Sequence, residues 1–230
     1  MHSSGSFLSK YKYFKGDQHM STSTKTMAAA QTKNRTKIRV MAQVGMLSAI
    51  ALVLMLFEIP LPFAPSFYEI DFSEVPVLVG CFAMGPLAGA TIEFIKIILN
   101  FAVNGTMTAG VGEIANFLIG CAFVVPAGLI YKKKHNRTGA IVGMISGTLF
   151  MTILGCFLNV YVLLPAYAKA FQMPMDALVG MGTAVNSHIT SVTTLVIFAI
   201  VPFNLLKGVL VSLIVFLIYK KISPIFHMGR

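Results

Sequence analysis

Five amide-bearing or charged side chains lie within the apolar segments between residues 113 and 207: Glu113, Asn116, Asn159, Asn204 and Lys207. The first two are three residues apart, as are the last two, and this spacing puts each pair on one face of a helix. Asparagine both donates and accepts hydrogen bonds, whereas lysine only donates them. The set suits a planar heterocycle with alternating carbonyl and N–H groups, and it lacks the several Arg or Lys residues expected for a phosphate.

The surrounding composition indicates a membrane protein. Of the 230 residues, 56% are hydrophobic and 11% charged, with a mean hydropathy of +0.79. Soluble domains carry about 25% charged residues. The composition therefore excludes an ordinary cytosolic enzyme, a disordered chain and a disulfide-stapled secreted domain.

The apolar segments predict an all-α, polytopic bundle of six transmembrane helices, one of them short. A spanning helix needs roughly 17–25 mostly apolar residues. We expect a flexible basic N-terminal tail over 1–39, a membrane substrate-binding domain over 40–222 and a short C-terminal tail over 223–230. A further short helix is expected near 175–183, and Pro202 should kink the last spanning helix. The six segments are 40–57, 75–84, 87–103, 113–131, 139–164 and 190–219.

The distribution of charge predicts the orientation. Of eighteen Lys and Arg residues, eight precede Val40, four lie within 132–137 and three follow Tyr219. Short loops rich in Lys and Arg stay in the cytoplasm. The N- and C-termini are therefore both expected inside. The net charge of +10 then reflects topology and needs no nucleic acid, while the lipid bilayer is the expected surrounding.

Helix rise places all five polar groups toward the outer side of the membrane. At 1.5 Å per residue they lie about 18–30 Å from the cytoplasmic ends of their three helices. That is the outer half of a hydrocarbon core about 30 Å thick. Ionisable groups inside a membrane are candidates for function. We expect a pocket open to the outside, against the alternative that these groups only bond between helices, with Lys207 paired to Glu113 or another acid.

Three further features have both structural and functional interpretations. Glu93 and Lys96 are also spaced i, i+3, and we expect them to pair with each other or Lys96 to pair with an acid of the 58–74 stretch. That Pro-rich, aromatic stretch is either a lid over the pocket or a packed surface loop. Gly45 and Ala49 form a small-residue face that serves either packing inside the bundle or docking to another membrane subunit.

Several kinds of chemistry have no motif here. The sequence contains no GxxxxGK[S/T] phosphate-binding loop, so ATP hydrolysis by that route is excluded. No HExxH, GxSxG or metal-binding cluster is present, and we expect no enzyme activity, cofactor or metal. The three cysteines lie in apolar segments, which argues against structural disulfides. Uphill transport would then need a partner that supplies energy.

Six stretches resemble one known family, the riboflavin-specific S component of energy-coupling factor (ECF) transporters. They are spread over about 40–222 and are specific only together. They are FEIPLPFAPSF at 57–67, IDFSEVP at 70–76, GPLAG at 85–89, VGEIANFLIG at 111–120, LNVYVLLP at 158–165 and PFNLLKG at 202–208.

The resemblance implies a six-helix subunit of a prokaryotic plasma membrane that captures riboflavin from outside. Release inside would need a transmembrane coupling (T) subunit and two cytosolic ATPases. It implies that Asn159, Asn204 and Lys207 contact the flavin and that Gly45 and Ala49 dock on the coupling subunit, where the family often has Ala-x-x-x-Ala. Glu113 and Asn116 are added from their depth. Alternatives are an S component for another vitamin (flavin mononucleotide or pantothenate), an ion-coupled carrier and, less favoured, a membrane enzyme.

Overall fold

The computed structural model describes residues 27, 36–62, 65, 68–106 and 108–227, with side chains described up to 219. The chain divides into two compact units, residues 1–43 and 44–230. Apart from Met27 and residues 36–39, the predicted N-terminal tail lies outside the described residues. The elements that form the cavity all lie in the second unit.

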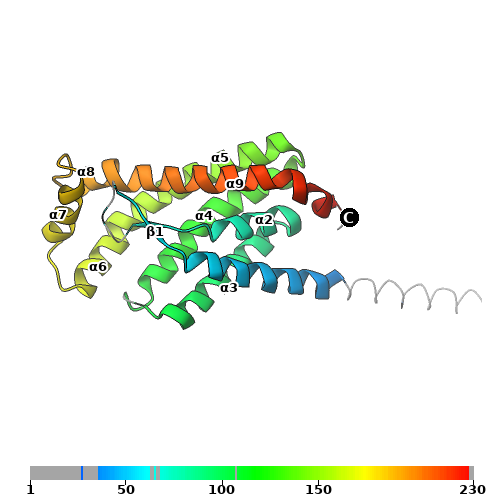
Figure 1. Cartoon of the computed structure of the whole chain (residues 1–230), viewed down its shortest axis with the longest axis horizontal. Helices are drawn as coiled ribbons and strands as arrows, with labels where there is room; N and C mark the ends of the chain where they lie inside the picture. The colour runs from blue at the N-terminus through cyan, green and yellow to red at the C-terminus, as the bar shows by residue number, and fades with distance from the viewer. Residues whose placement is uncertain (1–26, 28–35, 63–64, 66–67, 107, 228–230) are drawn as a thin grey trace, which may run out of the picture. The chain divides into compact units, whose positions relative to one another are not determined.

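The described chain is mostly helical (Figure 1). The first helix is Thr36–Met55. It is followed by a two-stranded hairpin, β1 and β2, and then by α-helices interrupted by two π-helical segments, η1 and η2. Their bounds are β1 Ile59–Pro60, β2 Glu69–Ile70, α2 Glu74–Met84, α3 Pro86–Asn104, α4 Val111–Lys133, α5 Arg137–Leu158, η1 Asn159–Leu163, α6 Leu164–Ala170, α7 Met175–Val185, α8 Val192–Leu195, η2 Val196–Ile200 and α9 Val201–His227.

Five continuous helices are long and apolar enough to cross a membrane within the described part of the chain: Thr36–Met55, Pro86–Asn104, Val111–Lys133, Arg137–Ala170 and Val192–Tyr219. The remaining predicted segment is the short helix α2, with 11 residues. The chain is therefore a multi-pass membrane protein with five long apolar helices and one short apolar helix at the positions where six segments were expected. The helix expected near 175–183 is α7.

Small residues allow the helices to approach closely. α4 packs against α3 and α5, α5 against α9, and α2 against α3, α4 and α9. A side chain at Gly143 of α5 would come within 2.7 Å of the Ala127 carbonyl oxygen on α4. At Gly147 it would collide with the Phe123 carbonyl. Because lipid tails are as apolar as leucine, such close backbone contact is a main source of association between membrane helices.

Gly85 separates α2 from α3. Its φ of +103° is readily adopted only without a Cβ. The next residue, Pro86, begins α3, where its missing N–H costs no helical hydrogen bond. A single residue, Gly85, therefore separates the end of α2 from the start of α3 at Pro86.

The segment expected to end near 164 is longer than predicted, because helical structure continues through η1 and α6 to Ala170. Pro165 has no N–H to donate, and the wide turn of η1 precedes it. A similar π segment, η2, precedes Pro202. Pro202 was expected to kink the last helix, and the structure has a π-helical segment just before it.

An apolar core holds the hairpin at the end of the bundle where α6, α7 and α8 lie (Figure 1). Tyr68 of the segment before β2 packs with Leu164, Leu178, Ile189 and Leu195, which are almost fully buried. Tyr68 therefore anchors the hairpin to these helices.

Candidate functional site

All five polar residues singled out from the sequence line one cavity of about 950 Å³. Glu113 and Asn116 come from α4, Asn159 from the start of η1, and Asn204 and Lys207 from α9. The expected convergence of three helices on one space is therefore present. Its volume lies within the range of about 300–1,000 Å³ typical of small-molecule sites.

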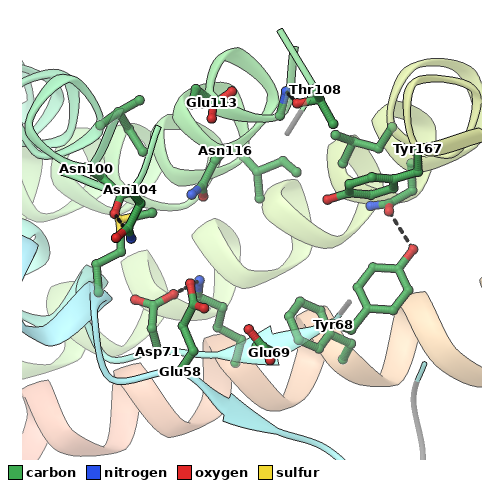
Figure 2. Close-up of a pocket in the computed structure, with 18 of the residues that line it drawn as sticks. Glu58, Tyr68, Glu69, Asp71, Asn100, Asn104, Thr108, Glu113, Asn116 and Tyr167 are labelled. Carbon is green, nitrogen blue, oxygen red and sulfur yellow. Dashed lines mark hydrogen bonds and ion pairs between the residues drawn. The ribbon is translucent and has the colours of Figure 1, made fainter. Parts of the chain in front are cut away.

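The cavity is also lined by residues that were not predicted from the sequence. The hairpin contributes acidic groups and an aromatic ring, the end of α3 contributes two amides, and α6 and α9 contribute further rings. They are Glu58, Tyr68, Glu69, Asp71, Asn100, Asn104, Tyr167 and Phe203. Figure 2 shows the hairpin side chains facing those of α3 and α4 across the opening. The described residues Glu58, Tyr68, Glu69 and Asp71 of the 58–74 stretch thus line one side of the cavity.

The two buried asparagines are fixed by bonds within their own helices and keep unused capacity. Asn159 Nδ2 donates to the Gly155 carbonyl at 2.8 Å, and Asn204 Nδ2 donates to the Ile200 carbonyl at 2.9 Å. The Ile200 carbonyl belongs to η2, and the Gly155 carbonyl lies in α5, four residues before η1 begins. Each amide group has a second N–H, which leaves a donor for a ligand.

Tyr68 fixes the other side of Asn159. Its hydroxyl donates to Asn159 Oδ1 at 2.6 Å (Figure 2). Burial raises the pKa of Tyr68 well above its usual value, so the phenol keeps its proton. The Tyr68 ring also lies 5.3 Å from that of Phe203. Aromatic faces and oriented amides together suit a flat polar ligand.

Lys207 pairs with Asp71 and not with Glu113. Its ammonium donates to Asp71 Oδ2 at 2.9 Å, so the alternative of pairing with another acid is the one found. Burial alone would raise the pKa of Asp71, but the ammonium groups of Lys207 and Lys96 outweigh it and hold the pKa below its usual range. Glu113 instead accepts from Thr106 Oγ1 at 3.0 Å.

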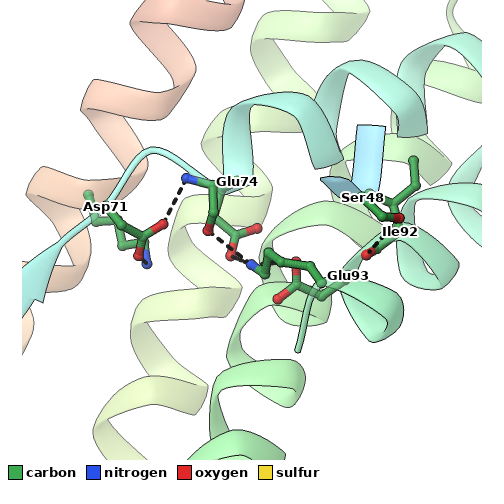
Figure 3. A network of polar contacts seen from close by, with 8 residues as sticks. Ser48, Asp71, Glu74, Ile92 and Glu93 are labelled. Atoms are coloured by element: carbon green, nitrogen blue, oxygen red, sulfur yellow. Dashed lines mark hydrogen bonds and ion pairs between the residues drawn. The ribbon is translucent and has the colours of Figure 1, made fainter. Parts of the chain in front are cut away.

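Behind Asp71 lies a buried ion network of Asp71, Ser73, Glu74, Glu93, Lys96 and Lys207 (Figure 3). Lys96 lies 2.8 Å from Glu93 Oε2 and 3.0 Å from Glu74 Oε1, so both expected kinds of partner are present. The Ser73 backbone N–H donates to Asp71 Oδ1 at 2.7 Å. Gly120 of α4 leaves room for the Glu93 carboxylate. The network ties α2, α3 and α9 together behind the cavity wall.

The small-residue face of the first helix does not pack inside the bundle. Gly45 and Ala49 are both exposed, and a Cβ built at Gly45 would have no packing neighbour within 4 Å among the residues that the structure describes. Packing inside the bundle, one of the two interpretations of this face, is thus wrong for these two residues. They remain available to a partner.

Comparison with known proteins decides the family. Residues 39–219 match the model of the family described as "ECF transporter, substrate-specific component". The chain belongs to this family. The S component is 36% identical to "Riboflavin transporter FmnP" of Bacillus subtilis (strain 168), over 84% of this chain and 97% of that protein. It is 35% identical to "Riboflavin transporter RibU" of Staphylococcus aureus (strain TCH60), over 78% and 88%.

A solved structure has the same fold as this S component. It was described under "Structure and mechanism of the S component of a bacterial ECF transporter". The two chains share 34% sequence identity with a TM-score of 0.64, over 83% of this chain and 99% of the other. The resemblance seen in the motifs therefore extends to the fold.

Proposed function

We propose that the chain is the riboflavin-binding S component of an ECF importer. The observation that carries the proposal is the meeting of Asn159, Asn204 and Lys207 in a cavity with aromatic walls. The isoalloxazine ring of riboflavin is flat and has carbonyl, ring nitrogen and N–H groups along one edge. The relatives named as riboflavin transporters support the same ligand.

The topology proposed for this function is six membrane segments, counting the short α2, with both termini in the cytoplasm. The charge distribution supports this orientation, since three lysines lie together at the C-terminal end of α4: Lys132, Lys133 and Lys134. The cavity then opens to the outside of a prokaryotic plasma membrane, and the hairpin closes over the bound ligand. Capture is proposed to need no catalysis by this chain, while a coupling subunit and two ATPases supply the energy for release.

The ligand can be identified directly. The protein purified from a flavin-replete host should be yellow, and mass spectrometry of the released ligand should give riboflavin. Pantothenate in its place would assign the chain to another vitamin. Uptake by liposomes that hold this chain alone under an ion gradient would instead favour an ion-coupled carrier and contradict the need for partners.

Alanine in place of Asn159 or Asn204 should weaken riboflavin binding. A ligand polar group left buried without its partner costs about 1–3 kcal/mol, or roughly 5- to 150-fold in Kd. Titration of each purified variant measures the change. Asn186→Ala, outside the cavity, is the matched control. Unchanged Kd values in both cavity variants would move the ligand elsewhere.

The exposed face of the first helix is proposed to dock on the coupling subunit. Gly45→Leu and Ala49→Leu should abolish co-purification of that subunit while riboflavin still binds, because two bulky side chains prevent close helix contact. Ile153→Trp enlarges an exposed side chain of α5 and should leave the complex intact. Complexes that survive both leucines would show that docking uses another face.

A further inference from the structure

Among the described residues, the ion network behind the cavity contains one more acid than base. Glu74 of α2 and Glu93 of α3 are 2% and 0% exposed, and Lys96, which contacts both, is also fully buried (Figure 3). The remaining members with charge, Asp71 and Lys207, pair with each other and line the cavity. Since that pair is balanced, two deeply buried carboxyl groups depend on a single ammonium group.

The two carboxyl groups converge on one place between α2, α3 and α4. The Lys96 ammonium lies 3.0 Å from Glu74 Oε1 and 2.8 Å from Glu93 Oε2. A Cβ built at Gly120 of α4 would collide with the Glu93 carboxyl group and would lie 3.2 Å from Glu74 Oε1. Glu74 Oε2 and Glu93 Oε1 have no hydrogen-bond partner among the described residues. The pair therefore combines an excess negative charge with buried oxygens that lack a donor.

The neighbouring elements supply no further positive charge to the pair in the described chain. The other titratable groups near it are Asp71 beside β2, Cys121 on α4 and Lys207 on α9. Lys207 is already bound to Asp71, and a thiol carries no positive charge. No group of three or more His, Cys, Asp or Glu side chains that could hold a metal ion is found among the described residues. Because an unbalanced charge is very unfavourable in a dry interior, such groups are neutralised instead.

We propose that Glu74 and Glu93 form a proton-binding site, in which the two carboxyl groups share one proton at neutral pH. With this proton, the group of Glu74, Glu93 and Lys96 has no net charge. Two carboxylates held in one site repel each other, and sharing a proton removes the repulsion. The proton also turns one unpartnered oxygen into a donor. The Lys207–Asp71 pair at the cavity keeps its charges, so this site is separate from the one proposed for riboflavin.

Infrared spectra of the ligand-free, full-length protein in detergent at about pH 7 test the proposal. Exposed Asp and Glu side chains are ionised at about this pH, whereas a protonated carboxyl group has a separate C=O band that shifts in D2O. The spectrum of the wild type minus that of Glu93→Gln should contain this band, because the Glu74 carboxylate left in the variant is balanced by Lys96. The same subtraction with Asp176→Asn, which removes an exposed carboxyl group of α7, should contain no such band.

A second variant and a change of buffer complete the test. Glu74→Gln should remove the same band, since the proton is shared, and it replaces Glu93→Gln if that variant does not fold. Difference spectra without an acid band would show that both groups are ionised and would overturn the inference. A band that is present without sodium ions and lost when they are added would assign the site to a metal cation and would overturn it as well. The spectra are recorded without ligand, so their result is independent of whether riboflavin binds.

Discussion

Replacement of Lys96 with methionine should destabilise the protein by about 3–5 kcal/mol, the usual cost of removing one partner from a buried ion pair. Lys96 is fully buried and binds both Glu74 and Glu93. Among the described residues, Glu74 Oε2 and Glu93 Oε1 already have no hydrogen-bond partner. Without the ammonium, two carboxylates would stand uncompensated among α2, α3 and α4.

Thermal unfolding in detergent measures this loss. A thiol-reactive fluorophore reports it, because Cys81 is buried and free and becomes reactive only when the bundle opens. Lys132→Met, at an exposed position on α4, is the matched control and should leave the transition temperature unchanged. Adding Glu74→Gln and Glu93→Gln to Lys96→Met should restore much of the lost stability, since whole buried ion networks are often replaceable. A Lys96→Met protein as stable as the wild type would contradict the role assigned to the network.

Replacement of Lys207 with methionine should weaken riboflavin binding by roughly 10- to 150-fold. A hydrogen bond from a charged donor contributes about 1.5–3 kcal/mol, and methionine keeps the length of the side chain without the donor. The same change leaves the Asp71 carboxylate in the cavity wall without its ion-pair partner, so stability should fall as well. Titration with riboflavin measures the first effect and the fluorophore assay the second.

A second substitution separates the two effects. Asp71→Asn in the Lys207→Met background removes the unpaired charge and should recover stability, whereas the riboflavin Kd should stay as weak as in the single variant. Asp71→Asn alone keeps the ammonium and should weaken binding less, because Asp71 only positions it. Recovery of affinity in the double variant would mean that Lys207 acts through folding and does not touch the ligand.

The sequence predicts the helices well where hydropathy agrees with residues that end or begin a helix. Gly85 and Pro86 mark the end of α2 and the start of α3, and a long apolar run marks α4. The segment that ends at Ala170 is longer than expected, because Pro165 normally signals the end of a helix. The π turn of η1 accommodates Pro165, which has no backbone N–H to donate. Hydropathy contains no signal for such a turn.

Depth along the helices predicts the cavity side chains of α4, η1 and α9, since helix rise is regular. The same reasoning cannot place the loop that faces them. Asp71 is the partner of Lys207 because the hairpin folds back along α9, and a loop path does not follow from periodicity. Asn100 and Asn104 have the i, i+4 spacing of one helix face at the C-terminal end of α3, and this signal was available in the sequence.

The most direct test of riboflavin capture is a fluorescence titration of ligand-free protein in detergent, without coupling subunit or ATPases. Flavin emission should be quenched saturably, with one riboflavin bound per chain, because Asn159, Asn204, Lys207 and the aromatic wall belong to this chain alone. A protein that is colourless as purified and leaves riboflavin emission unchanged would contradict the proposed function.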